Sequence, residues 1–400
     1  MMIKNLGWLI DMFRETDFID EYYADKDLSL LRKLTLVIPT YNRNYYLSRC
    51  LWYHAHFPFG QIIVADSSSV EKKMVNRETV TKIREVFDAN ILYLEYESET
   101  EVYGGDIFRK WGDAVMHVGT EYSQICTDKE FIFPLSSELA VSFLDNNLDY
   151  GSYEGYYVDV DLMGGALVPQ KIFTDRKSIS DTNPYLRLLL GISDSYSSIN
   201  LFAVKRTNIQ KAVFFPIVSR EINDIRFGEA IIELLTLVYA KYYYDSSYPQ
   251  KYRDITHSRR CGIRVLSESS DSRYPYINQY IIDGTYEHHF KCFVTCLSNS
   301  LNNCSKSNND VNIVEWIITP YLERRGLYLS SYTQLFRRYS WIFRLIPRYL
   351  YQKLPSTGVR VNQSIELTPS IYEQDILALL HKETIGGALK KRDLDLLFSW

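Results

Sequence analysis

The sequence lacks several patterns that would place it in a well-defined class of protein. No apolar run is long enough to cross a bilayer, and the N-terminal residues MMIKNLGWLIDMFRETDF carry charges among their apolar positions, unlike a signal peptide. The chain also has no G-x-x-x-x-G-K-[ST] P-loop, no nucleophile elbow and no G-x-G-x-x-G dinucleotide motif. These absences exclude those nucleotide and hydrolase motifs, and they favour a protein of the cytoplasm.

Cysteine is scarce, and none of the six cysteines forms a C-x-x-C pair. Cys292, Cys296 and Cys304 lie close together in the sequence, with His288 and His289 beside them. A zinc site is one interpretation of this group, but buried reduced thiols are the favoured one. Reduced cysteines fit a cytoplasmic compartment.

A strong net charge is also lacking. The formal net charge at pH 7 is −4 over 400 residues, which argues against a general nucleic-acid binder. Aromatic residues are abundant, with 33 Tyr and 19 Phe. Tyrosine-rich surfaces suit the binding of sugars or bases, although an AT-rich codon bias would give the same composition.

Between residues 34 and 126, short apolar runs alternate with amphipathic segments. Such runs predict strands buried on both faces, and the segments between them predict helices. The predicted strands are 34–38 (LTLVI), 61–65 (QIIVA), 90–96 (NILYLEY) and 122–126 (YSQIC), and the predicted helices are 42–55, 71–88 and 104–119. This order predicts an α/β fold with a doubly wound, mostly parallel, Rossmann-like sheet.

The second part of the chain has a mixed pattern. Residues 156–168 are typical of antiparallel strands with a Gly-Gly break, residues 200–205 of a strand, and residues 227–243 of an apolar helix. From about residue 275 onward the pattern predicts a mainly helical region. Within it, the Asn- and Ser-rich stretch 297–310 predicts a mobile loop.

Acidic residues follow two of the predicted strands, at the edge where parallel sheets bind ligands. Asp66 and Asp128 are therefore expected to face one crevice. Asp128 and Glu130 alternate in the turn TDKE, so both could bind one Mg²⁺ or Mn²⁺ ion and present it to a diphosphate. A solvated acidic turn is the alternative interpretation of an isolated D-x-E.

Three stretches together resemble a known family. LTLVIPTYNR (34–43), QIIVADSSS (61–69) and YSQICTDKEFIFP (122–134) resemble the nucleotide-sugar-binding half of GT-A fold glycosyltransferases, especially the inverting family 2 type. The resemblance covers residues 33–140. A weaker likeness over NLFAVKRTNI, FGEAIIELL and the YRD at 252–254 is typical of bacterial enzymes of surface polysaccharide synthesis.

The resemblance implies roles for single residues in binding a nucleotide-sugar donor. Thr40, Tyr41 and Arg43 match the loop that borders the nucleotide. Asp66 matches the residue that contacts the base or ribose. Lys110 lies on the helix before the acidic turn, where it is expected to approach the phosphates.

The resemblance also implies a divalent cation, Mn²⁺ or Mg²⁺, at the acidic turn. Asp128 and Glu130 match the first and last positions of the D-x-D motif. Two departures weaken the match. DSSS stands where a second acid is more common, and Lys129 places a cation beside the metal site. Weakened metal dependence and loss of catalysis are therefore open alternatives.

Glu229 and Glu233 lie four residues apart, on one face of the predicted helix 227–243. In the family that the chain resembles, a carboxylate deprotonates the acceptor hydroxyl, which then displaces the diphosphate at the anomeric carbon. One of the two glutamates is the expected base, and Glu229 matches the family position better. Carboxylates favoured by the helix dipole are the alternative, and Asp159 and Asp161 are further candidates for contacts with the acceptor.

The expected organisation has three parts. These are a helical extension (1–32), a GT-A-like catalytic domain (33–265) with a nucleotide-sugar half (33–140) and an acceptor half (141–265), and a helical C-terminal region (266–400). Residues 332–354 of the last part contain arginines and aromatics but no acidic residue. Such a segment suits peripheral contact with the inner face of the plasma membrane, or equally a helical cap on the catalytic domain.

The sequence thus predicts a metal-assisted, inverting glycosyltransferase that moves a sugar to a glycan or lipid-linked acceptor. One alternative is a sugar-phosphate nucleotidyltransferase, which needs a Gly-rich basic loop where this chain has PTYNRNYY. The other is a catalytically silent scaffold that binds a glycan or a partner enzyme. The oligomeric state is left open.

Overall fold

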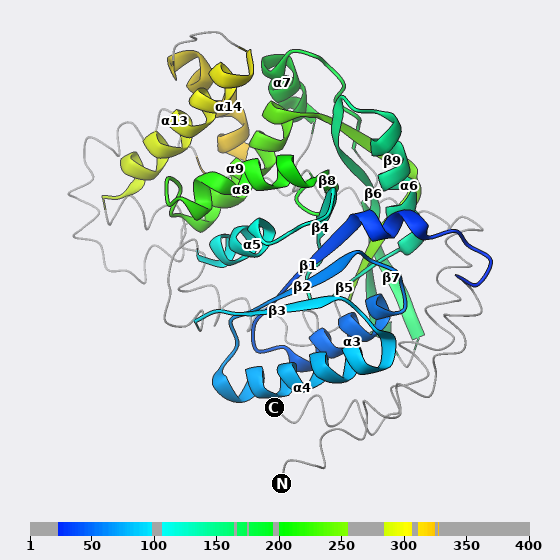
Figure 1. Cartoon of the computed structure of the whole chain (residues 1–400). Coiled ribbons are helices and arrows are strands. Elements are labelled where there is room, and N and C mark those ends of the chain that lie inside the picture. The colour runs from blue at the N-terminus through cyan, green and yellow to red at the C-terminus, as the bar shows by residue number, and fades with distance from the viewer. Residues whose placement is uncertain are drawn as a thin grey trace.

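The computed structural model describes residues 23–97, 106–163, 166–173, 176–194, 200–254, 284–305, 311–324 and 327. Among these residues, nine strands form one sheet with helices on both of its faces (Figure 1). The strand order is β3-β2-β1-β4-β8-β6-β9-β5, and β7 pairs with β6 outside this path. The predicted α/β class is therefore confirmed.

The first half of the sheet is parallel, as predicted. Its elements are a 3-10 turn η2 (Ser29–Lys33), β1 (Leu34–Thr40), α3 (Asn44–Ala55), β2 (Gln61–Asp66), α4 (Val70–Phe87), β3 (Ile91–Glu95), α5 (Asp106–Met116) and β4 (Tyr122–Ile125). β1 pairs with β2 and with β4, and β3 pairs with β2 at the edge. The register places Thr40 beside Asp66, so the loops after β1 and β2 begin at the same level of one edge.

The second half of the sheet is mixed. Its elements are β5 (Glu130–Ile132), α6 (Pro134–Asn146), β6 (Tyr150–Met163), β7 (Ala166–Phe173), α7 (Pro184–Asp194), β8 (Val204–Arg206), α8 (Thr207–Val218), α9 (Ile225–Tyr239) and β9 (Lys241–Asp254). β8 lies antiparallel between β4 and β6, and β6 and β9 are parallel. The antiparallel strands expected at 156–168 are β6 and β7.

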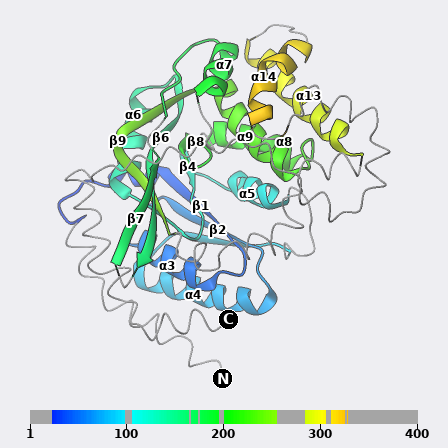
Figure 2. The ribbon, with the colours of Figure 1, turned by 180° about the vertical axis from the view of Figure 1, so that it is seen from behind.

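All seven residues of β1 are buried, which requires helices on both faces of the sheet. Leu36 and Ile38 belong to a core that also contains residues of α3, α4 and α6. Val37 belongs to a second core, with residues of α5, α8 and α9. Figures 1 and 2 show α3 and α4 below the strands and α5, α8 and α9 above them, so the sheet is doubly wound.

One predicted helix extends too far. The apolar pattern at 227–243 predicted a single helix, but α9 ends at Tyr239 and β9 begins at Lys241. β9 then pairs with β6 and with β5, so its conformation is set by two neighbouring strands. The prediction failed here because tertiary pairing overrides a local periodicity that continues by chance.

The described C-terminal residues are helical, as expected. α13 (Tyr286–Ser305) packs on α9, and α14 (Val311–Arg324) packs on α13 and α7, within the second core. The loop predicted at 297–310 is wrong over 297–305, because Leu297 and Leu301 are buried on the last turns of α13.

Residues 1–22 and the amphipathic segment 332–354 lie outside the described residues. Among the helices that are described, none combines the length and the apolar character needed to cross a membrane.

Candidate active site

The loops that follow β1 and β2 are tied together by Asn42 and two serines. Asn42 has a φ of 56°, a left-handed conformation that Asn tolerates better than most residues. Its N–H donates to Oγ of Ser68 at 2.8 Å, and its side-chain oxygen accepts from the N–H of Ser69 at 2.9 Å. Ser68 and Ser69 therefore hold the PTYN turn in place.

Asp66 is fully buried at the end of β2 and accepts three hydrogen bonds. The donors are the N–H of Ser68 at 2.7 Å, Nδ2 of Asn76 at 2.7 Å and the hydroxyl of Tyr93 at 2.5 Å. Burial and the bond to Asp66 raise the pKa of Tyr93, so its hydroxyl stays a donor. Asp66 thus joins β2 to α4 and β3, and this anchoring role was not evident in the sequence.

Lys110 reaches from α5 to the ends of β1 and β2. Its buried ammonium donates to the carbonyl oxygen of Thr40 at 3.1 Å and to Oγ of Ser67 at 2.7 Å. A positive charge therefore lies at the carboxyl edge of the parallel strands, and the approach of Lys110 to a phosphate stays a prediction.

Asp128 lies opposite the loop that follows β1. Oδ2 accepts from Oγ1 of Thr40 at 2.8 Å, and Oδ1 pairs with Nη1 of Arg43 at 3.2 Å. Burial raises the pKa of Asp128, and Arg43 and Thr40 oppose that shift. The Arg43 side chain is 48% exposed, so it extends from a buried carboxylate to the surface, beside the half-buried Tyr41.

Glu130 faces a different partner from Asp128. Its Oε1 accepts from Nζ of Lys251 on β9 at 2.8 Å, and its Oε2 accepts from the N–H of Thr127 at 3.0 Å. The side chains of Glu130 and Lys251 are each 2% exposed. Lys251 carried no motif that would have revealed this role, because its pairing with Glu130 depends on the contact between β5 and β9.

The two carboxylates do not fit a shared divalent cation in this arrangement. Each of the four carboxylate oxygens of Asp128 and Glu130 accepts a hydrogen bond or pairs with a cation, and neither side chain is more than 2% exposed. Mg²⁺ and Mn²⁺ require oxygen ligands and usually keep bound water. The metal-binding role of Asp128 and Glu130 stays a prediction.

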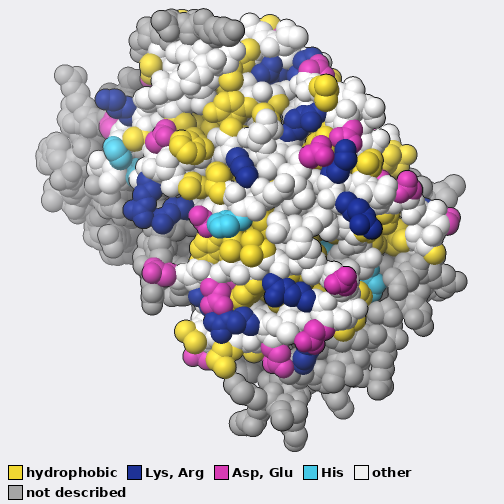
Figure 3. Space-filling model, in the orientation of Figure 1, with side chains coloured by type: hydrophobic (Ala, Val, Ile, Leu, Met, Phe, Trp, Pro, Cys, Tyr) yellow, Lys and Arg dark blue, Asp and Glu magenta, His cyan; other side chains and the backbone are white. Residues whose placement is uncertain are grey.

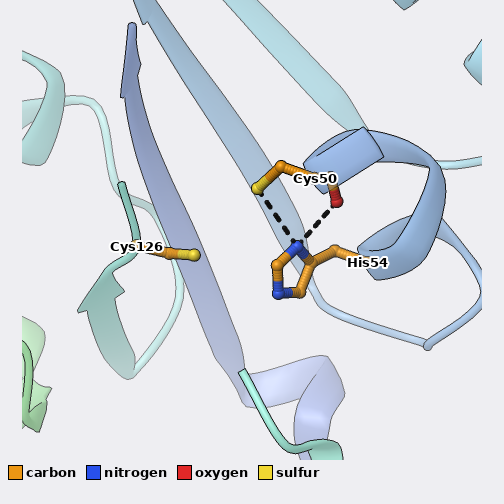
Figure 4. Close-up of side chains that lie close together, drawn as sticks. All are labelled: Cys50, His54 and Cys126. Carbon is orange, nitrogen blue, oxygen red and sulfur yellow. Dashed lines mark hydrogen bonds between the residues drawn. The ribbon is translucent and has the colours of Figure 1, made fainter. Parts of the chain in front are cut away.

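A second group of potential metal ligands lies beneath the acidic turn (Figure 4). Cys50 and His54 of α3 and Cys126 after β4 are buried, and their ligand atoms lie within 4.8 Å of one another. His54 nevertheless uses both nitrogens on the backbone: Nδ1–H donates to the carbonyl of Cys50 at 2.8 Å, and Nε2 accepts from the N–H of Ile132 at 3.1 Å. No histidine nitrogen remains for a metal ion.

The same group fastens α3 to the segment that carries the acidic turn. The thiols of Cys50 and Cys126 both donate to the carbonyl of Glu130, at 3.6 and 3.3 Å, and burial raises the pKa of Cys126. This group was missed from the sequence, although Cys50 and His54, two of its three residues, lie four apart within the predicted helix 42–55.

The two candidate bases have different surroundings on α9. Glu233 is buried and accepts a 2.5 Å hydrogen bond from Tyr321 of α14. Glu229 is half-buried, one turn earlier in the helix. Beside it, Gly228 lies close to Phe108, on the helix that supplies Lys110.

Asp224 was not identified from the sequence as the N-cap residue of α9. Its Oδ1 accepts from the N–H groups of Arg226 and Phe227, both at 2.9 Å, which satisfies two donors at the helix N-terminus. An Asp before an apolar helical run is the signal that would have found it. Asp159 and Asp161 lie on β6, and their side chains are outside the described residues.

The chain was also compared with known proteins. No protein-family model matches it, and neither does any curated protein. Among solved structures, the chain is similar to S. aureus TarS 1–349, with a TM-score of 0.43 and 15% identity over 78% of each chain. A longer S. aureus TarS structure gives a TM-score of 0.47 and 16% identity, over 79% of this chain and 50% of that one.

TarS 1–349 in complex with UDP-GlcNAc gives a TM-score of 0.45 and 17% identity, over 78% of this chain and 79% of that one. Because these TM-scores lie below 0.5 and these identities below 25%, the similarity assigns neither a family nor an activity to the chain.

Proposed function

We propose that the chain is a glycosyltransferase of the GT-A type that binds a nucleotide-activated sugar. One observation carries the proposal. Lys110, Thr40 and Asp128 come from three separate segments and are joined by hydrogen bonds at the carboxyl edge of the parallel strands. This edge is where open α/β sheets bind ligands, and these residues belong to the motifs that resemble the family.

The donor would lie across the loops after β1, β2 and β4. Arg43 is the exposed cation of this edge and suits the diphosphate, because a guanidinium presents several donors to phosphate oxygens. Tyr41, in the same loop, offers an aromatic surface to the nucleotide. Asp66 acts indirectly, because its three hydrogen bonds fix the loop after β2 against α4 and β3.

The proposed reaction is a single displacement. The acceptor hydroxyl oxygen forms a bond to the anomeric carbon, the bond from that carbon to the diphosphate oxygen breaks, and the hydroxyl proton moves to a carboxylate. We assign the base to Glu229. Its helix packs on α5, the helix that carries Lys110, whereas the Glu233 carboxylate is buried against Tyr321.

Several finer features belong to the same proposal. They are inversion of configuration, a glycan or lipid-linked acceptor, a place in the synthesis of a bacterial-type surface polysaccharide, and peripheral contact with a membrane. They rest on the resemblance of the motifs in residues 33–140 and 200–254 and on the composition of residues 332–354.

A thermal-shift screen of UDP-, GDP- and dTDP-sugars tests donor binding. A sugar nucleotide that binds the folded chain stabilises it by mass action and so raises its melting temperature. At a ligand concentration of 100 Kd, the free energy of unfolding rises by about 2.7 kcal/mol. Arg43→Ala is expected to reduce the shift, and Arg77→Ala, at an exposed arginine of α4 that pairs with Glu95, is the control. A screen in which no sugar nucleotide changes the melting temperature would contradict the proposal.

Product analysis separates the alternatives. A glycosyltransferase releases a nucleoside diphosphate, and Glu229→Gln should stop this release while leaving the thermal shift in place. A sugar-phosphate nucleotidyltransferase would release pyrophosphate from a nucleoside triphosphate. A silent scaffold would bind a glycan without turnover of any donor.

A further inference from the structure

Among the residues that the structure describes, three cationic side chains act on the two acids of the turn in the candidate active site. Asp128 pairs with Arg43, and Glu130 pairs with Lys251. Lys129, between the two acids, adds a third cation, and its charge acts on Asp128. A divalent ion would add two positive charges at this point, where Coulomb repulsion opposes its binding.

The ammonium of Lys251 is fixed on more than one side. Nζ lies 2.8 Å from Oε1 of Glu130, 3.3 Å from the ring centroid of Phe202 and 5.2 Å from that of Tyr157. Aromatic faces attract cations, and removing one partner of a buried ion pair is strongly destabilising. Both effects keep the ammonium against Glu130.

The cations on the outer side of the turn are accessible. The Arg43 side chain is 48% exposed, whereas that of its partner Asp128 is 2% exposed. Lys129 is half-buried. The positive ends of these side chains are thus closer to solvent than the carboxylates, which is the order that suits an anionic ligand.

We propose that Lys251 takes the place of a divalent cation at the acidic turn, and that the chain binds the diphosphate of its donor through Arg43 and Lys129 without a divalent metal ion. The identity of the donor rests on the proposed function, whereas the assignment of Lys251 does not. Lys251 is a positioning residue, since it acts through Glu130.

Electron paramagnetic resonance titration with Mn²⁺ alone tests the turn on the full chain. The wild type is expected to show no Mn²⁺ site with a Kd below about 1 mM. Lys251→Met removes the ammonium and leaves Glu130 able to bind metal, so Mn²⁺ affinity should rise about tenfold or more. Lys251→Met combined with Glu130→Gln should lose this gain.

Lys241→Met is the matched control, because Lys241 lies on the same strand and pairs with Asp149 near the surface. It should behave as the wild type. One tight Mn²⁺ site in the wild type overturns the proposal, and that measurement needs no variant to fold. A folded Lys251→Met chain that gains no Mn²⁺ affinity overturns the assignment of Lys251.

A second measurement separates this inference from the proposed function. The thermal shift caused by UDP-GlcNAc, or by whichever sugar nucleotide binds in the screen, is measured in EDTA and again in Mn²⁺. Equal shifts are expected. A shift that EDTA abolishes overturns the inference and supports the proposed function, whereas no shift in either condition counts against the proposed function alone.

Discussion

Two buried acids, Asp66 in the first half of the sheet and Glu154 in the second, are held in different ways. In the first half, Asp66 is bound by an N–H, an amide and a hydroxyl. In the second half, Glu154 accepts from the hydroxyl of Tyr242 at 2.6 Å and also forms an ion pair with the buried Arg176. Glu130, at the junction, follows the second pattern through Lys251.

Asp66 is held by uncharged donors, whereas Glu154 is also held by a cation. A buried ion pair must overcome the desolvation of both charges, and its main effect is that neither partner can leave. In the second half, the Glu154–Arg176 pair joins β6 to the segment after β7, and the Glu130–Lys251 pair joins β5 to β9. In the first half, Arg43 pairs with the buried Asp128 at the carboxyl edge, and its side chain is 48% exposed.

The largest expected effect comes from breaking the Glu154–Arg176 pair. Arg176→Met leaves an uncompensated buried carboxylate, so the free energy of unfolding should fall by about 3–5 kcal/mol. Urea denaturation measures the change. Glu154→Gln in the same chain should restore much of the loss, and a drop below about 1 kcal/mol in the single variant would show that Glu154 is already neutral or solvated.

The corresponding change in the first half is Asp66→Asn. The new amide presents a donor to groups that already donate, so one or more buried donors lose their acceptor, at about 1–3 kcal/mol of unfolding free energy. The thermal shift with a sugar nucleotide should also shrink, since Asp66 holds the edge where the donor is proposed to bind. A variant of wild-type stability would refute the anchoring role.

The buried Lys205 should make the stability of the fold depend on pH. Burial lowers the pKa of this lysine from its ordinary value to about 7, although the charges of Glu154 and Glu233 oppose the shift. Between about pH 7 and pH 10 the unfolded chain therefore binds more protons than the folded one, and stability should rise with pH by about 1 kcal/mol per unit. Melting temperatures across this range, for the wild type and Lys205→Met, measure it. The variant should lack the slope.

The smallest effect is expected at the surface pair Arg77–Glu95. Nη2 of Arg77 donates to Oε2 of Glu95 at 2.7 Å, and the side chains are 51% and 36% exposed. Figure 3 shows basic and acidic side chains interspersed on one face of the molecule, so such a charge has other neighbours of both signs. Arg77→Ala should leave the melting temperature unchanged within error. A clear drop in melting temperature would mean that burial alone does not determine how much an ion pair contributes to stability.

The parallel half was readable from the sequence because its signals are local. The predicted strands are short apolar runs, and an amphipathic segment of helical period follows each of the first three. The contacts of Thr40, Lys110 and Asp128 follow from the order of these elements, since parallel strands end at one edge. β9 was not readable, because its 14 residues are fixed by pairing with β6 and β5.

The sequence by itself determined the α/β class, the parallel order of the first four strands and the clustering of polar residues at their carboxyl ends. Only the tertiary structure decided which cation each acid meets. Asp128 and Glu130 are two residues apart, yet one pairs with Arg43 and the other with Lys251, 121 residues away along the chain. Strand alternation would place residues two apart on one face, but Asp128 lies in the turn before β5. Long-range packing supplies a different partner for each acid, and these partners bear on whether the turn can accept a metal ion.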